Sequence, residues 1–379
     1  MTSSPRSALL ATLAGISVAC SSIDQPSTPL SVDQGASALA ALGAIAVASN
    51  ASTGNAVLVF ARRRNGSLEA PTSYPTGGTG TGGGLGNQGA VVLSGDHAHL
   101  FAINAGSNDV SVFAVAGNQL SLTDRVASGG MQPISVTEHD GTVYVLNAGG
   151  AGSISGFHLN SDGTLSPLAG STQPLSAAGV GPAQIGFSPN GATLVVTEKG
   201  TNLITLYDVE ANGIAGAPRP EASAGMTPFG FAFDGRGRLV VSEAFGGGAG
   251  AAAVSSYGAN LSGALQTRSA TVGNGQAAAC WVAITPDGRY AYVTNTATAN
   301  VSGYALNTDA QLTLLQGGVS GLTGLTPIDL AISPDGKRLY TLDSGDHQLS
   351  SFTVRKDGSL ERGASTTGLP MFTNGMAAW

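Results

Sequence analysis

A unit of four short strand signals recurs along this 379-residue chain, and its period constrains the fold more than any other feature. The clearest copy is TPIDLAISPDGKRLYTLDSGDHQLSSFTVRKDGSLERGAS, residues 326–365. Asp-Gly turns between its alternating runs are typical of antiparallel hairpins. Equivalent starting positions follow at steps of 45, 49, 46, 51 and 48 residues: Gln88, Pro133, Pro182, Pro228, Ala279 and Pro327. A four-stranded unit with a period of about 40–50 residues indicates a β-propeller blade.

The two ends of the chain complement each other as parts of one blade. The C-terminal NGMAAW supplies a first strand with nothing after it, and residues 43–50, 55–62 and 67–73 supply the three missing strands. We therefore predict an all-β, seven-bladed propeller over residues 43–379, with four antiparallel strands per blade. The C-terminal strand would complete the N-terminal blade and remove the open sheet edge. A flat β-solenoid, the alternative, would not need this complementation.

The composition agrees with an all-β chain and excludes one class of partner. Only 10% of the residues are charged, whereas long solvent-facing helices normally carry many charges, and the 56 glycines indicate many tight turns. The net charge is −7, and no cationic run is longer than Arg62-Arg63-Arg64. Because nucleic-acid binding needs clustered cations, we expect no nucleic-acid partner.

The N-terminus has the pattern of an export signal. Residues 1–19 contain one cation, a short apolar core from Ala8 to Val18, and the small residues Ser17-Val18-Ala19 directly before Cys20. We expect a cleaved signal peptide over 1–19, a linker or tether over 20–42, and an extracytoplasmic monomer: periplasmic, at the cell surface or secreted. Membrane contact would come only through a lipid on Cys20. A disordered N-terminal tail is the alternative.

Two repeated features have structural interpretations. One aromatic residue stands at the same place in each third strand and predicts packing between blades: Phe60, Phe113, Phe157, Tyr207, Tyr257, Tyr304 and Phe352. Two Gly-rich insertions, residues 75–89 and 245–254, interrupt the period. We interpret each as a flexible connection, with a lid over a site as the alternative.

The ends of the second strands predict a ring of polar side chains on one face. Strands alternate in direction, so these ends lie beside the starts of the first strands, at one mouth of the channel. The ring reads Asn50, Asn104, Asn147, Glu198, Glu243, Asn295 and Asp343. Asn and Asp cap turns with their own side chains, whereas Glu does so poorly. Glu198 and Glu243, in adjacent blades, are therefore the candidate catalytic carboxylates, with exposed loop residues as the alternative.

Other side chains are candidates for binding a substrate at this mouth. Asn147, Asn295 and Asp343 belong to the ring, and His347 lies in a loop on the same face. Gln184, Trp281 and Asp329 share an equivalent first-strand position; Trp281 would stack on a ring-shaped ligand or fill the channel wall. The pattern offers no paired Cys or His site for zinc and no calcium loop, so we expect no metal and no cofactor.

Three stretches carry a resemblance to a known family: ISPDGKRLYTLDSG, ITPDGRYAYVTNTATANVSGYAL and FSPNGATLVVTEKGTNLITLYDV. They resemble the lactonase-type seven-bladed propellers, which include 6-phosphogluconolactonases, carboxymuconate cyclases and YVTN-repeat propellers, over residues 43–379. In the resemblance Glu243 matches a family glutamate. The family's His and Arg positions are occupied by Ala183, Gln184, Phe229 and Gly230. Because a phosphosugar needs cations, the resemblance implies a lactone other than 6-phosphogluconolactone.

These observations leave two functions open. In the first, Glu198 and Glu243 hydrolyse a neutral or cationic lactone-like small molecule: one carboxylate steers a water as general base, and Asn147 or Gln184 orients the carbonyl. In the second, the propeller is a non-catalytic scaffold of the cell envelope that binds a protein or a glycan.

Overall fold

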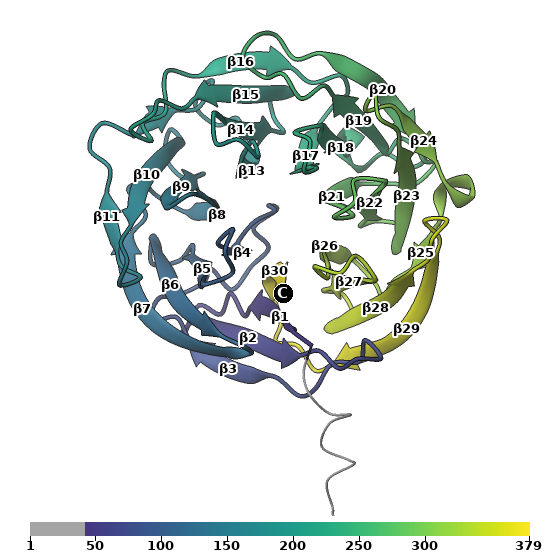
Figure 1. Ribbon diagram of the computed structural model, residues 1–379, viewed down its shortest axis with the longest axis horizontal. Helices are drawn as coiled ribbons and strands as arrows, with labels where there is room; N and C mark the ends of the chain where they lie inside the picture. The colour runs from purple at the N-terminus through teal and green to yellow at the C-terminus, as the bar shows by residue number, and fades with distance from the viewer. Residues whose placement is uncertain (1–41) are drawn as a thin grey trace, which may run out of the picture. The chain divides into compact units, whose positions relative to one another are not determined.

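The computed structural model describes residues 42–379, whose strands form seven antiparallel sheets arranged as blades around a central channel (Figure 1). The predicted seven-bladed, four-stranded propeller is confirmed. The predicted signal peptide (1–19), Cys20 and nearly all of the predicted linker lie outside the described residues.

Each blade begins with an innermost first strand and proceeds outward. Blade 1 contains β30 (Asn374–Ala378), β1 (Ala44–Ala48), β2 (Ala56–Ala61) and β3 (Thr72–Pro75). Blade 2 contains β4 (Val91–Leu93), β5 (His99–Asn104), β6 (Asp109–Ala116) and β7 (Gln119–Ala127). Blade 3 contains β8 (Pro133–His139), β9 (Thr142–Asn147), β10 (Ser153–Leu159), β11 (Leu165–Pro167) and β12 (Gln173–Pro174).

The remaining four blades repeat this order. Blade 4 contains β13 (Pro182–Phe187), β14 (Thr193–Glu198), β15 (Leu203–Asp208) and β16 (Arg219–Ala222). Blade 5 contains β17 (Pro228–Phe233), β18 (Leu239–Glu243), the 3₁₀ turn η2 (Phe245–Gly247), β19 (Ala253–Tyr257) and β20 (Thr267–Gly273). Blade 6 contains β21 (Ala279–Ile284), β22 (Tyr290–Asn295), β23 (Asn300–Leu306), β24 (Leu312–Leu314), η3 (Gln316–Gly318) and β25 (Gly321–Leu322). Blade 7 contains β26 (Pro327–Ile332), β27 (Arg338–Asp343), β28 (Gln348–Val354) and β29 (Leu360–Thr367).

The ring closes through blade 1, as the chain ends predicted. Strand β30 pairs antiparallel with β1, with Ala377 opposite Ala46, and the Trp379 backbone N–H donates to the Ala44 carbonyl at 3.0 Å. The fourth strand of this blade begins later than predicted. Leu68 makes only an isolated bridge to Arg62, and β3 starts at Thr72. Pro71, which has no N–H to donate, stands between the two.

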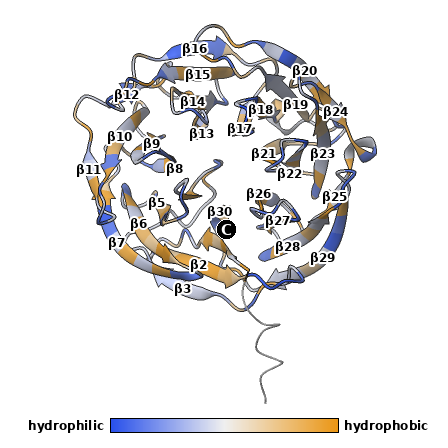
Figure 2. Cartoon of the chain, viewed as in Figure 1, coloured by the Kyte–Doolittle hydropathy of each residue, from blue (hydrophilic) through white to orange (hydrophobic). Residues whose placement is uncertain are grey.

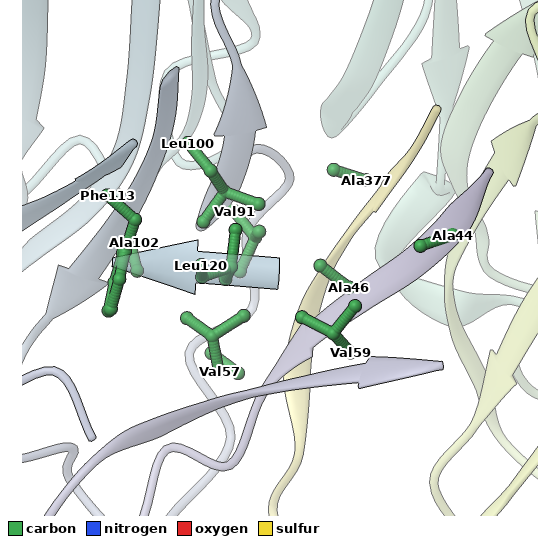
Figure 3. Close-up of a cluster of buried hydrophobic side chains, with 11 residues drawn as sticks. Ala44, Ala46, Val57, Val59, Val91, Leu100, Ala102, Phe113, Leu120 and Ala377 are labelled. Carbon is green, nitrogen blue, oxygen red and sulfur yellow. The ribbon is translucent and has the colours of Figure 1, made fainter. Parts of the chain in front are cut away.

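The apolar core lies mainly between neighbouring blades. Every predicted third-strand aromatic is at most 2% exposed and packs against the preceding blade, which confirms their structural interpretation. Figure 3 shows one such interface, where Phe113 and Leu100 of blade 2 face Ala46 and Val59 of blade 1. Hydrophilic residues gather on outer strands such as β16 and β29, whereas β1, β2 and β15 are largely hydrophobic (Figure 2).

Tyrosine hydroxyls connect three of these interfaces. Tyr144, Tyr292 and Tyr340, each on a second strand, donate to the carbonyls of Gly213, Gly358 and Gly66 at 2.9, 2.9 and 3.0 Å. Each acceptor belongs to the turn before the fourth strand of the next blade. The repeated turns therefore also fix the angular spacing of the blades, which positions the channel mouth.

Candidate functional site

Most side chains of the ring at the second-strand ends form hydrogen bonds that link the second strand to the third strand of the same blade. The ring side chains are at most 3% exposed, and most bond to a hydroxyl that stands seven residues later on the third strand. These pairs are Asn104–Ser111 (2.8 Å), Glu198–Thr205 (2.8 Å), Asn295–Ser302 (2.8 Å) and Asp343–Ser350 (2.5 Å). Asn147 and Glu243 make the same bond to Ser155 and Ser255 across longer loops. Six of the seven ring side chains thus bond within their own blades, whereas the Asn50 side chain bonds to Thr81 and Gly83 of the insertion between blades 1 and 2.

Glu198 has both carboxylate oxygens occupied. Oε1 accepts from the Ser176 backbone N–H at 3.0 Å and from the Thr205 hydroxyl, and Oε2 accepts from the hydroxyls of Ser176 and Thr201. The residue is fully buried. This carboxylate ties the segment that enters blade 4 to the β14–β15 hairpin, and in this conformation it does not reach the channel.

Glu243 occupies the equivalent place in blade 5 but is less well satisfied. Ser255 donates to Oε1 at 2.5 Å, whereas Oε2 has no hydrogen-bond partner although the residue is fully buried. Burial raises the pKa of this carboxyl to about 7, an effect that the Ser255 hydroxyl partly offsets, together with the nearby Ser223 hydroxyl and Gly225 N–H, neither of which meets hydrogen-bond geometry to it. Glu243 and Glu198 have separate sets of hydrogen-bond donors, each around its own second-strand end.

The other ring candidates are also bonded locally. Asn147 donates to the Ser128 carbonyl, and Asn295 donates to Asn300 at 2.7 Å and accepts from Asn274. Asp343 accepts from the Gly324 N–H at 2.8 Å, and burial raises its pKa. His347 is half-buried in the β27–β28 turn with a left-handed backbone, φ 52°. None of these candidates is freely exposed at the mouth among the residues described.

The first-strand candidates connect neighbouring blades. Gln184 behaves like an extra peptide group: its amide donates to the Phe231 carbonyl at 3.1 Å and accepts from the Phe231 N–H at 2.7 Å. Asp329 is 2% exposed, and burial raises its pKa well above the usual range, with backbone N–H groups of Leu330 and Met376 opposing the shift. Trp281 is 4% exposed and packs on Phe229 with 4.9 Å between ring centroids. It therefore fills the channel wall, one of its two predicted roles.

The Gly-rich insertion between blades 1 and 2 is the main departure from the predictions. Residues 76–88, called the plug here, cross the channel mouth and are hydrogen-bonded to several blades. The interpretation of this insertion as a flexible connection is therefore wrong. The Gln88 side chain bonds both to the carbonyl and to the N–H of Val282, at 2.8 and 3.1 Å, and its backbone N–H donates to the Ala183 carbonyl. Glycine is required for this close path: a Cβ on Gly80 would lie 2.2 Å from the Asn50 backbone.

Beneath the plug lies a cluster that the sequence did not identify as a unit, formed by Lys199, Phe229, Cys280 and Trp281 and called the mouth cluster here. The Lys199 ammonium lies 4.8 Å above the Phe229 ring and donates to the Gly86 carbonyl. The Trp281 indole N–H donates to the Asn87 carbonyl at 2.7 Å. Both donors thus hold carbonyl oxygens of the plug.

The electrostatics of the mouth cluster follow from its burial. Burial lowers the pKa of Lys199 to about 8, with Cys280 opposing the shift, and raises the pKa of the buried Cys280 thiol to about 11. One sequence signal could have identified Lys199. It is one of only three lysines in the chain and directly follows a ring residue.

Two further properties concern residues 42–379. No group of three or more His, Cys, Asp or Glu side chains in this range is arranged to hold a metal ion. None of its helices is long and apolar enough to cross a membrane.

Comparisons with known proteins agree with the fold. The family model described as Lactonase, 7-bladed beta-propeller matches residues 51–173 and 82–373. The periplasmic gluconolactonase of Pseudomonas aeruginosa is 18% identical over 88% of this chain and 98% of its own, with a TM-score of 0.67. A Bacteroides uniformis protein named as a candidate 6-phosphogluconolactonase is 19% identical over 89% and 99%, with a TM-score of 0.69. At these identities the similarity shows the fold alone. No curated protein sequence matches significantly.

Proposed function

Because the chain belongs to the lactonase family of seven-bladed β-propellers, we propose that it hydrolyses a small neutral lactone at the mouth of its central channel. One observation carries the proposal. Two donors, the half-buried Lys199 ammonium and the buried Trp281 indole N–H, hold the carbonyl oxygens of Gly86 and Asn87 in the plug. When the plug lifts, these donors are available for the carbonyl oxygen of a ligand, with Phe229 and Trp281 as an apolar wall.

The proposed chemistry assigns one role to each charged group. Water adds to the lactone carbonyl carbon while Glu243 takes its proton, and the Lys199 ammonium stabilises the oxyanion that forms. The ring C–O bond then breaks, and Glu243 returns the proton to the leaving ring oxygen, giving the hydroxy acid. A pKa of about 7 suits a general base at neutral pH. Glu198 is assigned a bracing role, because donors occupy both of its oxygens.

Catalysis in this proposal requires two segments to move. Glu243 pairs through its backbone with Pro228, next to Phe229 of the mouth cluster, but its carboxylate is enclosed in the conformation described. Residues 244–252, which follow it directly, include four glycines and the η2 turn. Their displacement together with the plug would bring the carboxylate to the mouth.

The proposal is tested with glucono-1,5-lactone and its 6-phosphate as substrates. We expect wild type to accelerate hydrolysis of the neutral lactone in preference to the phosphorylated one, since Lys199 is the single cation of the mouth cluster. Lys199→Met and Glu243→Gln should each reduce kcat/KM by about 100-fold or more. Glu198→Gln is the matched control and should retain activity wherever it folds. Hydrolysis at the spontaneous rate by wild type would overturn the proposal.

A specific observation favours the second candidate function, a non-catalytic propeller that binds an apolar protein surface. Met131, Met226, Leu325 and Phe372 each stand two residues before a first strand, and each is 43–61% exposed. They surround the mouth face. Exposed apolar side chains gathered on one face are typical of interaction sites, and methionine adapts to varied partners.

Photo-crosslinking in cells tests this second candidate function. A benzoylphenylalanine in place of Met226 should give a discrete protein adduct, whereas the same group in place of Lys356, on the opposite face, should not. Equal labelling from both positions would eliminate a specific mouth-face partner.

The proposed function includes export of the protein from the cytoplasm. It is supported by the N-terminal pattern of residues 1–20 and by the periplasmic location named for the Pseudomonas aeruginosa gluconolactonase of the same fold. The mass of the mature protein distinguishes cleavage after Ala19, lipidation of Cys20 and an intact N-terminus. An intact N-terminus in the purified cellular protein would contradict export by this signal.

A further inference from the structure

A cavity lies in the channel, away from the residues of the mouth cluster. It has a volume of about 230 Å³ and is lined by the first strands of blades 2 to 5. Its walls are mainly three aliphatic side chains and three rings: Val92, Val136, Ile185, Phe187, Phe231 and Phe233.

The lining of this cavity is chemically distinct. No titratable side chain lines it, whereas the other cavities described for residues 42–379 include Arg289 and Lys337, Arg236 and Arg268, or Asp96 and Glu138. Its two polar side chains are already engaged. Gln184 is paired with the backbone of Phe231, and the Thr137 hydroxyl accepts from the Phe187 N–H at 3.2 Å. A ligand would therefore meet polar side chains that already have backbone partners.

The cavity is closed toward the mouth and open at the other end. Gly89, which lines it, directly follows the plug, and Gln88 bonds to Ala183 beside Gln184, so the plug forms its inner end. Phe187 and Phe233 are the last residues of β13 and β17, next to the turns of the opposite face, and both are partly exposed. The channel is thus a blind pocket entered from the face opposite the mouth.

We propose that this blind pocket is a binding site for a small apolar molecule, or for an aromatic ring or short alkyl group of a larger ligand. Burying apolar ligand surface against the partly exposed Val92, Phe187 and Phe233 side chains supplies the driving force, about 25 cal/mol per Å². Apolar cavities of about 150 Å³ bind molecules of the size of benzene, so this one accommodates a substituted ring. The site is independent of the mouth cluster and of lactone hydrolysis.

Toluene is the probe that tests the proposal, with binding to the intact protein measured by calorimetry and ligand-observed NMR. We expect saturable binding to wild type in the millimolar range or tighter. Val92→Phe, at a half-buried lining position, should fill the pocket and weaken binding at least tenfold. Val354→Phe, at a half-buried valine that lines a charged cavity, is the matched control and should bind as wild type.

Folding of each variant is checked by thermal denaturation, and Ala232→Leu serves as a second filling variant. The absence of saturable toluene binding to wild type would overturn the proposal. Binding that is equally strong in wild type and in a folded filling variant would do the same, since the probe would then sit elsewhere.

Discussion

At the scale of single residues, two glutamates in the same register position have different energetic environments. Donors satisfy both oxygens of Glu198, whereas Glu243 is equally buried with one oxygen unpartnered. An unpaired buried carboxylate destabilises the folded state unless it takes up a proton. Glu243 is therefore a position where stability is reduced, as is common at functional sites.

This difference predicts the pH dependence of stability. Because the folded pKa of Glu243 is raised from 4.5 to about 7, folding favours the protonated form, and stability falls as pH rises from 4.5 to 7. Glu243→Gln removes the charge, so its free energy of unfolding should exceed that of wild type by up to about 3 kcal/mol at pH 8 and match it near pH 4.5. Chemical denaturation at both pH values measures this.

The control for that prediction is the same substitution one blade earlier. Glu198→Gln turns an amide nitrogen toward hydroxyl and N–H donors and should destabilise the protein by about 1–3 kcal/mol. A Glu243→Gln variant that is less stable than wild type at pH 8 would show that its carboxylate is satisfied after all.

The sequence identified the ring positions but not the direction of their side chains. Asn295 and Glu243 fall at the same place in the repeat, and the repeat alone predicts that place. Their orientation depends on hydroxyls such as Ser302 and Ser255, whose regular spacing was present in the sequence but becomes meaningful only once the strand register is known. Lys199 was missed because its partners, Gly86 and Phe229, are distant in the chain.

At the scale of elements, glycine content alone did not distinguish a flexible connection from a segment that is held in one position by hydrogen bonds. Residues 76–88 are bonded across the mouth because Asn87 and Gln88 supply side-chain amides that replace missing strand partners. The strands themselves were predictable, since alternation and Asp-Gly turns are local signals. The plug depends on contacts between segments nearly 200 residues apart, which local patterns do not encode.

Loosening the plug should expose Trp281. In a Trp379→Phe background Trp281 is the single tryptophan, and Gln88→Ala removes both side-chain bonds to Val282. We expect acrylamide to quench the fluorescence of this variant several-fold more strongly, because the plug covers the indole. Gln311→Ala, at an exposed glutamine, should leave quenching unchanged. Equal quenching with and without Gln88 would mean that this side chain does not hold the plug.

At the scale of the whole molecule, the ring is closed by one short strand. Strand β30 lies on the inner side of β1, and Met376 and Ala377 pack in the interfaces with blades 7 and 2 respectively. This closure was predictable from the sequence, because a lone first strand at one end matches three strands at the other.

Removal of residues 374–379 should therefore abolish cooperative folding, since it exposes two interblade interfaces and an unpaired strand edge. Trp379→Ala is the control: it keeps the backbone pairing and loses the indole bond to the Gly117 carbonyl, at a cost of about 1 kcal/mol. Thermal denaturation followed by circular dichroism measures both. A truncated chain that melts like wild type would contradict the role given to β30.

The pH dependence of kcat/KM for glucono-1,5-lactone, after subtraction of the spontaneous rate, tests the central claim most directly. The assigned roles predict a rise with a pKa of about 7, as Glu243 ionises, and a fall with a pKa of about 8, as Lys199 loses its proton. Glu243→Gln should abolish the rising limb together with most of the rate. Turnover that is absent in wild type, or that keeps the same profile in Glu243→Gln, would contradict a lactone site at this mouth.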